Sequence, residues 1–170
     1  WGNILPQLLI YHRAVPILID ADEERLKTAA QCGIYYTVHA NEEMLGEVTR
    51  ITGGRLASAA VHCSYNNLSP VLPFAVTAFG GMVVYTGFSF PECTAQLKPA
   101  FDKQLTLSAV ANDYSNIESA INLLLNKAVN IAPLHLVTHP VSDAAAVLGD
   151  GAAKAKNGEN VPVSLLNMLS

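Results

Sequence analysis

The stretch VPILIDADEERL, residues 15–26, decides the expected fold. Its apolar run stops at Asp20, and the pattern of a helix start follows at once. The first turn of that helix is acidic, as the helix dipole favours: Asp22, Glu23 and Glu24. A strand that ends on a carboxylate and passes directly into a helix is typical of the second strand of a nucleotide-binding βαβ unit.

At that place a carboxylate accepts hydrogen bonds from both adenosine ribose hydroxyls and repels a 2′-phosphate. Asp20 therefore favours NAD over NADP. The same residues also fit an ordinary strand followed by a capped helix. On this stretch alone, both interpretations stay open.

Composition narrows the class of protein. The chain has 170 residues, enough for one domain with a core of its own. Its net charge of −4 argues against a nucleic-acid partner, and its apolar runs are shorter than a membrane span needs. Cys32, Cys63 and Cys93 form no C-x-x-C pair, which favours a reducing compartment. We expect a soluble cytoplasmic protein that binds neither nucleic acid nor membrane.

Short β-rich runs alternate with helical patterns along the whole chain, every ~20–25 residues. This alternation predicts an α/β fold with a parallel sheet and crossover helices. The expected strands are 15–20, 35–39, 57–63, 82–86, 105–110, 134–139 and 161–169, with 57–63 buried. The expected helices are 3–13, 22–32, one begun by Asn41 and ended by Gly53 and Gly54, 68–79, 115–127 and one from about 142.

Three of these segments carry finer expectations. In the helix 22–32, Leu26, Ala29 and Ala30 should face inward and Gly33 should end it. In the helix 115–127, Ser115 and Glu118 form a capping box and one face is apolar: Ile117, Ile121, Leu124 and Leu125. The segment 151–160, rich in Lys, Gly and Asn, is predicted to be a mobile surface loop.

Four stretches together carry a resemblance that spans almost the whole chain. They are GNILPQLLIYHRAVPILIDADEERLKTAAQCGI (2–34), EVTRITGGRLASAAVHC (47–63), FGGMVVYTGFS (79–89) and LLLNKAVNIAPLHLVTHPVSDAAAVL (123–148). In this order they resemble the nucleotide-binding domain of the zinc-type alcohol dehydrogenases, the medium-chain dehydrogenase/reductase family. The resemblance implies a Rossmann-type, doubly wound, mostly parallel sheet. It also implies that the family's first strand and first two motif glycines would precede Trp1, so we expect residues upstream in the natural protein.

Matched to the family position by position, Gly2 is the third glycine of the G-x-G-x-x-G turn and Asp20 is the ribose-binding acid. Arg25 matches a basic position that can reach the adenosine ribose or a nearby phosphate. Arg25 could equally be a solvated arginine that pairs with Asp22 or Glu24.

Further cofactor contacts are implied at two other strand ends. Ser64 and Tyr65 fall where the family contacts the adenine and ribose, although Tyr65 is bulkier than is usual there. Thr86, Gly87 and Phe88 fall where backbone groups hold the nicotinamide carboxamide, although Gly87 could also be a simple turn glycine. No catalytic residue is expected within the chain.

Loss of the family's first strand would leave a gap between its second and fourth strands, with backbone groups unpaired. Either upstream residues or another segment of the chain should fill it. Val161–Leu169 is one candidate, but Pro162 fits poorly in a central strand.

The cysteines and histidines show no tetrahedral metal-site spacing. His135 and His139 lie in an extended segment and should not converge, Cys63 is expected to be a small core residue, and His62 is expected to be structural or adjacent to the cofactor. The resemblance places the family's zinc in the catalytic domain, outside this chain. Residues 1–140 are expected to be the NAD-binding domain, and 141–170 a helix, loop and strand that return toward the catalytic domain.

The implied function is the NAD-binding domain of a zinc-type alcohol or polyol dehydrogenase, inactive on its own, whose intact enzyme transfers hydride between a small alcohol and NAD. The family also implies a homodimer, with Leu105–Val110 or Leu134–Val137 as the pairing edge. Two alternatives remain: a dinucleotide-sensing module without catalysis, and a methyltransferase on a Rossmann-like fold.

Overall fold

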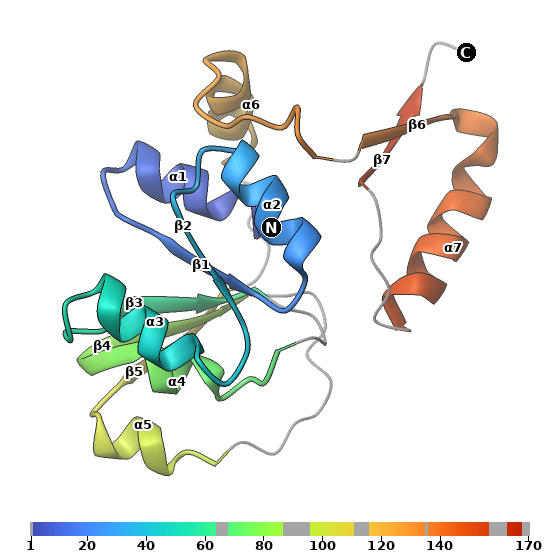
Figure 1. Cartoon of the computed structure of the whole chain (residues 1–170). Helices are drawn as coiled ribbons and strands as arrows, with labels where there is room; N and C mark the ends of the chain where they lie inside the picture. Colours follow the sequence, from blue (N-terminus) through green and yellow to red (C-terminus); the bar gives the residue numbers. More distant parts are fainter. Residues whose placement is uncertain are drawn as a thin grey trace. The chain divides into compact units, whose positions relative to one another are not determined.

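The computed structural model describes residues 2–63, 68–86, 96–110, 116–134, 136–156 and 163–167. The chain forms two compact units, Trp1–Asn130 and Ile131–Ser170. Parallel strands alternate with helices along the chain (Figure 1), which confirms the predicted α/β class. The strand β6 (Leu136–Pro140) belongs to the second unit, whereas the sequence placed the domain boundary after residue 140. The roles assigned to the two domains stay predictions.

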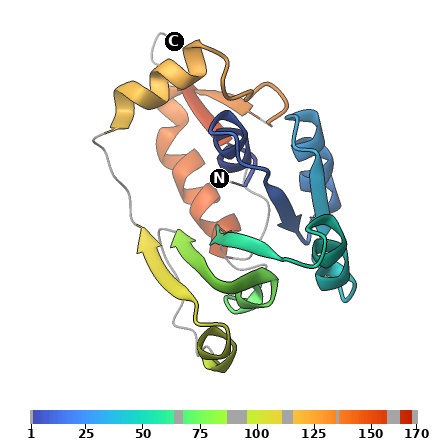
Figure 2. The ribbon, with the colours of Figure 1, turned by 90° about the vertical axis from the view of Figure 1, so that its left-hand side faces the viewer.

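The strands of the first unit fall into two sheets. β1 (Ile17–Asp20) pairs in parallel with β2 (Tyr36–His39). The other sheet is parallel too and has the order β3–β4–β5; in Figure 2 these strands lie side by side in teal, green and yellow. Their bounds are β3 (Ala57–His62), β4 (Thr77–Thr86) and β5 (Thr106–Val110). In the described part of the chain no pairing joins β1 to β3, and a further strand between them stays a prediction.

Six helices lie among the described residues of the first unit: α1 (Leu5–Tyr11), α2 (Glu23–Gln31), α3 (Met44–Ile51), α4 (Leu72–Val76), α5 (Lys98–Asp102) and α6 (Ile117–Leu125). α2 packs against β1 and β2, and α4 packs against β3 and β4. One buried cluster links the two sheets, because Ile17 and Ile19 of β1 and Ala60 of β3 contact the same core: Val38, Met44, Val48 and Val76.

The end of α2 follows from its sequence. Gly33 takes a φ of +84°, which suits glycine, and its N–H donates to Ala30 O at 3.0 Å. Ile34 N–H donates to Ala29 O at 3.1 Å, so the helix closes in a Schellman motif. Ala29 is fully buried, as predicted, but Ala30 is exposed, because each residue turns about 100° around the helix axis.

The predicted helix 68–79 is wrong at both ends, because α4 begins at Leu72 and stops at Val76, and β4 begins at Thr77. Lys103 caps the C-terminal end: its Nζ donates to Phe74 O, Ala75 O and Thr77 O at 2.8–2.9 Å, which satisfies the last carbonyls of α4. Burial lowers the pKa of Lys103. This cap comes from a residue 26–29 positions further along the chain, where local sequence signals do not reach.

Two other helices differ from prediction at the start. Asn41 does not cap α3 directly: its Oδ1 accepts from Glu43 N–H at 3.0 Å, and the helix begins at Met44. The N-cap residue of α6 is Asn116, and Ser115 of the predicted capping box lies outside the described residues. The apolar residues of α6 share one face as predicted, but Ile117, Ile121, Leu124 and Leu125 are all exposed.

The prediction that residues 57–63 form a buried strand is also only partly right. β3 has the expected position, but Ser58, Ala59 and Val61 are exposed. In the described residues β3 pairs on one side only, with β4, so it is an edge strand here. Its last residue, His62, is buried.

The second unit contains β6, a 3-10 helix (Val141–Asp143), α7 (Ala144–Lys156) and β7 (Val163–Asn167). α7 continues through residue 156, so the predicted loop 151–160 is wrong over its first six residues, and 157–160 lie outside the described part. β7 pairs in parallel with β6. The suggestion that Val161–Leu169 fills the gap in the sheet stays a prediction. Within the described ranges, no helix is long and apolar enough to cross a membrane.

Candidate functional site at the end of strand β1

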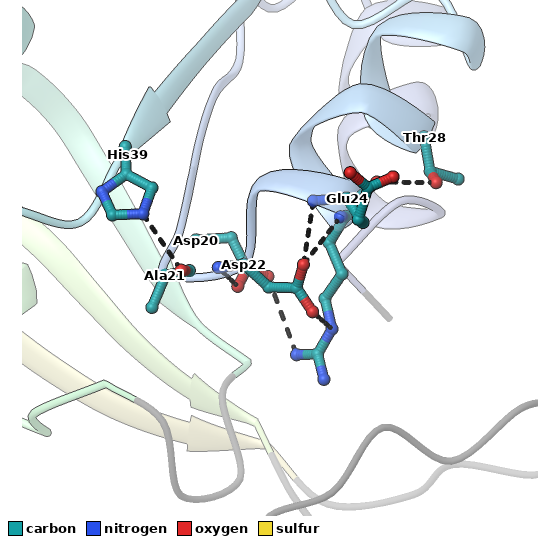
Figure 3. Close-up of polar contacts among 7 residues, drawn as sticks. Asp20, Ala21, Asp22, Glu24, Thr28 and His39 are labelled. Carbon is teal, nitrogen blue, oxygen red and sulfur yellow. Dashed lines mark hydrogen bonds and ion pairs between the residues drawn. The ribbon is translucent and has the colours of Figure 1, made fainter.

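The candidate site is built around Asp20, the last residue of β1 (Figure 3). One oxygen of its carboxylate, Oδ1, accepts a hydrogen bond from Asp22 N–H at 3.0 Å. The side chain is 20% exposed, so the carboxylate lies at the surface of the unit but is partly desolvated. Because Asp20 ends a parallel strand, it lies at the sheet edge where α/β proteins bind ligands.

Asp22 begins the helix that follows. Its Oδ1 accepts from Glu24 N–H at 2.9 Å and from Arg25 N–H at 3.3 Å, which satisfies two backbone donors of the first turn of α2. The carboxylate is thereby fixed in direction, and its second oxygen points toward the Arg25 side chain, with Asp22 Oδ2 3.5 Å from Arg25 Nε.

Arg25 lies between two carboxylates. Besides the ion pair with Asp22, its Nη1 lies 3.9 Å from Asp20 Oδ2. The predicted pairing with Asp22 is therefore present, whereas Glu24 pairs with Lys27 instead. The structure brings Asp20 and Arg25 together, and the part that Arg25 plays toward a cofactor stays a prediction.

The sequence analysis missed His39 as part of this region. His39 ends β2 directly opposite Asp20, and its Nε2 lies 3.1 Å from Ala21 O, which ties the end of β2 to the turn after β1 (Figure 3). The signal was present in the sequence, since neighbouring parallel strands end at the same sheet edge. The imidazole stabilises the turn that carries Asp20.

The carboxyl ends of β3 and β4 meet in a second polar cluster. Thr86 Oγ1 donates to His62 O at 3.3 Å, and Tyr85 OH donates to Pro70 O at 2.7 Å. The rings of His62 and Tyr85 lie 5.7 Å apart, centroid to centroid. Burial lowers the pKa of His62, and hydrogen bonds to the backbone of Leu68 and Ser69 oppose this shift. The expected structural role of His62 fits this packing.

The other predicted contacts fall as follows. Gly2 lies beside β1: a Cβ built on it would be 4.0 Å from Leu18 Cδ1, an ordinary contact, so the packing here does not require glycine. Thr86 is the last residue of β4. Four further predicted residues lie outside the described part of the chain: Ser64, Tyr65, Gly87 and Phe88. Among the residues that are described, no group of three His, Cys, Asp or Glu side chains is placed to hold a metal ion.

A parallel α/β unit whose strand ends on a carboxylate beside a capped helix has the build of a Rossmann-like nucleotide-binding domain. Comparison with known proteins agrees with this class. No protein-family model matches the chain. An uncharacterized zinc-type alcohol dehydrogenase-like protein of Haemophilus influenzae is 26% identical over 130 residues, which are 76% of this chain and 37% of that protein.

Two solved structures share the fold. An NAD-dependent alcohol dehydrogenase is 21% identical, with a TM-score of 0.73 over 95% of this chain and 46% of its own. The alcohol dehydrogenase of Aeropyrum pernix is 20% identical, with a TM-score of 0.74 over 97% of this chain and 46% of its own. The chain is thus related to the zinc-type alcohol dehydrogenases of the medium-chain dehydrogenase/reductase family, as the sequence predicted. It spans less than half the length of these relatives, which is consistent with their nucleotide-binding domain.

Proposed function

We propose that this chain is the NAD-binding domain of a zinc-type alcohol or polyol dehydrogenase. The observation that carries the proposal is the position of Asp20 at the carboxyl end of β1, in a chain related to that family. In the intact enzyme, bound NAD would accept a hydride from the carbon of a small alcohol. The zinc and the catalytic groups would come from residues outside this chain.

The geometry around Asp20 suits the adenosine ribose of NAD. One carboxylate oxygen is held by Asp22 N–H, and the other faces Arg25 at 3.9 Å, beyond hydrogen-bond distance. That second oxygen can therefore accept a ribose hydroxyl. Two carboxylates and one guanidinium leave a net charge of −1, which opposes a 2′-phosphate.

The remaining cofactor contacts are part of the same proposal. Gly2 would be the third glycine of the pyrophosphate-binding turn, and Ser64 and Tyr65 would contact the adenine and ribose. Thr86, Gly87 and Phe88 would hold the nicotinamide end. The exposed edge strand β5 would pair with its copy in a homodimer.

Calorimetric titration with NAD and with NADP tests the cofactor site. We expect the parent chain to bind NAD more tightly than NADP. Asp20→Asn keeps an oxygen for the Asp22 hydrogen bond but removes the charge, and should weaken NAD binding about tenfold. The matched control is Asp102→Asn, which removes an exposed carboxylate paired with Lys98 on α5 and should leave binding unchanged.

Equal NAD affinity in Asp20→Asn and the parent would contradict the role of Asp20. A third arm of the titration uses S-adenosylmethionine, whose binding in place of NAD would favour the methyltransferase alternative. Turnover of alcohols by an intact enzyme that contains this domain, as proposed here, would exclude a sensor without catalysis.

A further inference from the structure

We infer that Asp22 is a specificity-determining residue of the cofactor site, which acts by competing with Asp20 for the Arg25 guanidinium. This inference rests on the proposed function, because it concerns how the same site chooses between NAD and NADP. Asp22 is a positioning residue, since it acts through Arg25 and not on the cofactor.

The two oxygens of Asp22 have different partners. Oδ1 accepts the N–H groups of Glu24 and Arg25 and so holds the carboxylate against the first turn of α2. Oδ2 is thereby directed at the Arg25 guanidinium, 3.5 Å from Nε. A carboxylate that caps a helix can adopt few rotamers. The start of α2 therefore fixes the position of the Asp22 carboxylate with which Arg25 pairs.

Asp22 and Asp20 compete for the same guanidinium. Arg25 Nε lies 3.5 Å from Asp22 Oδ2, and Arg25 Nη1 lies 3.9 Å from Asp20 Oδ2, so the contact with Asp22 is the closer one. The Arg25 and Asp20 side chains are 32% and 20% exposed, so a direct bidentate pair between them would be partly shielded from water. With Asp22 as a second anion, the Asp20–Arg25 ion pair stays at 3.9 Å, longer than a hydrogen bond, so Asp20 Oδ2 can accept a ribose hydroxyl.

Without the Asp22 charge, Arg25 would turn to Asp20. The carboxylate would then be occupied, and the affinity for the NAD ribose would fall. The Arg25 guanidinium would also lie beside the ribose with one carboxylate next to it in place of two. Binding of a 2′-phosphate would then be more favourable. Both changes alter the cofactor preference in the same direction, toward NADP.

Asp22→Asn isolates this effect. Asparagine is as good an N-cap as aspartate, so the hydrogen bonds to α2 are kept, but an amide replaces the oxygen that faces Arg25. The ratio of NADP to NAD dissociation constants, measured by calorimetry on the 170-residue chain, should fall about threefold. Loss of fold would abolish binding of both cofactors, so the ratio is compared only for variants that circular dichroism shows to be folded.

Two controls separate positioning by Asp22 from a general charge effect. Glu24→Gln removes the same charge from the same helix turn, from a side chain that pairs with Lys27, and should not change the ratio. In an Arg25→Gln background, Asp22→Asn should also leave the ratio unchanged, because the residue through which it acts is absent. Asp22→Ser, which keeps a capping oxygen, repeats the test if the asparagine variant does not fold.

The inference is supported if Asp22→Asn lowers the ratio of NADP to NAD dissociation constants in the parent chain but not in the Arg25→Gln background. An unchanged ratio in Asp22→Asn, or a fall of equal size in Glu24→Gln or in the Arg25→Gln background, overturns it while the proposed function stands. If the parent chain binds neither cofactor, the proposed function fails, and this inference fails with it.

Discussion

Gln7 on α1 and Asn130 at the end of the first unit exchange two hydrogen bonds, although 123 positions separate them in the chain. Gln7 Nε2 donates to Asn130 O at 3.1 Å, and Asn130 N–H donates to Gln7 Oε1 at 2.6 Å. Gln7 is buried, and Cys32 Sγ lies 3.7 Å from the same carbonyl. The segment that follows α6 is thereby fastened to the first helices of the unit.

Replacing this glutamine should therefore destabilise the fold. We expect Gln7→Leu to lower the free energy of unfolding by about 2–3 kcal/mol, because it removes the side-chain partner of the Asn130 N–H and C=O. Urea denaturation followed by circular dichroism measures the change. Gln31→Leu, at an exposed position at the end of α2, serves as control and should change little. Equal effects of the two substitutions would contradict the role of the Gln7 contact.

A second prediction concerns Gly81 in β4. A Cβ at this position would lie 2.5 Å from Thr77 Cγ2 and 2.8 Å from Ser58 O, so Gly81→Ala forces neighbouring backbone to move and should cost about 2 kcal/mol. Gly46 is the matched control, since it lies in α3 with open space around it, and Gly46→Ala should stabilise by up to about 1 kcal/mol. The midpoint temperature of thermal unfolding should fall for Gly81→Ala and rise for Gly46→Ala. A shift of both midpoints in the same direction would refute the steric argument.

The cap that Lys103 places on α4 gives a third prediction. Lys103→Met keeps the aliphatic stem but loses the hydrogen bonds to the carbonyls of Phe74, Ala75 and Thr77, which should cost about 2 kcal/mol in unfolding free energy. Lys98→Met, on the exposed face of α5, should cost less than about 0.5 kcal/mol. Equal urea midpoints for Lys103→Met and Lys98→Met would contradict a capping role of Lys103.

The fourth prediction is a pH dependence that arises from His62. Burial lowers its pKa in the folded state, so below the ordinary value of 6.5 the unfolded chain takes up the proton first. Stability should fall as the pH falls below 6.5, with a slope from this residue of at most about 1.4 kcal/mol per pH unit. His62→Gln should flatten the curve of unfolding free energy between about pH 6.5 and 5, whereas the exposed His12→Gln should not. Parallel curves of unfolding free energy against pH for the parent and His62→Gln would refute this prediction.

Self-association through β5 is the fifth prediction. All five residues of β5 are exposed, and among the described strands β5 pairs with β4 alone, which leaves a free edge. Light scattering should give a dimer, and Leu107→Lys, at a 43% exposed apolar residue of β5, should shift the chain toward monomer. A parent chain that light scattering shows to be monomeric at high concentration would contradict self-association through β5. Leu45→Lys, on α3 and equally exposed, is the matched control.

Local sequence signals predicted much of this structure. The strand before Asp20, the helix after it and its end at Gly33 depend on residues within a few positions of each other, so propensity, capping and glycine conformation suffice to predict them. The resemblance to the zinc-type alcohol dehydrogenases also came from the order of such local motifs. The pairing of Arg25 with Asp22 was foreseen for the same reason, since three positions on a helix bring side chains together.

Contacts between distant parts of the chain decided the rest. α4 ends where Lys103 reaches its carbonyls, β3 has one strand partner in the described residues, and β7 pairs with β6. The sequence by itself determined the elements and the acid that ends β1, because these follow from short-range chemistry. Only the tertiary structure decided where α4 stops and which of the described strands are edges, because these depend on groups that folding alone brings together.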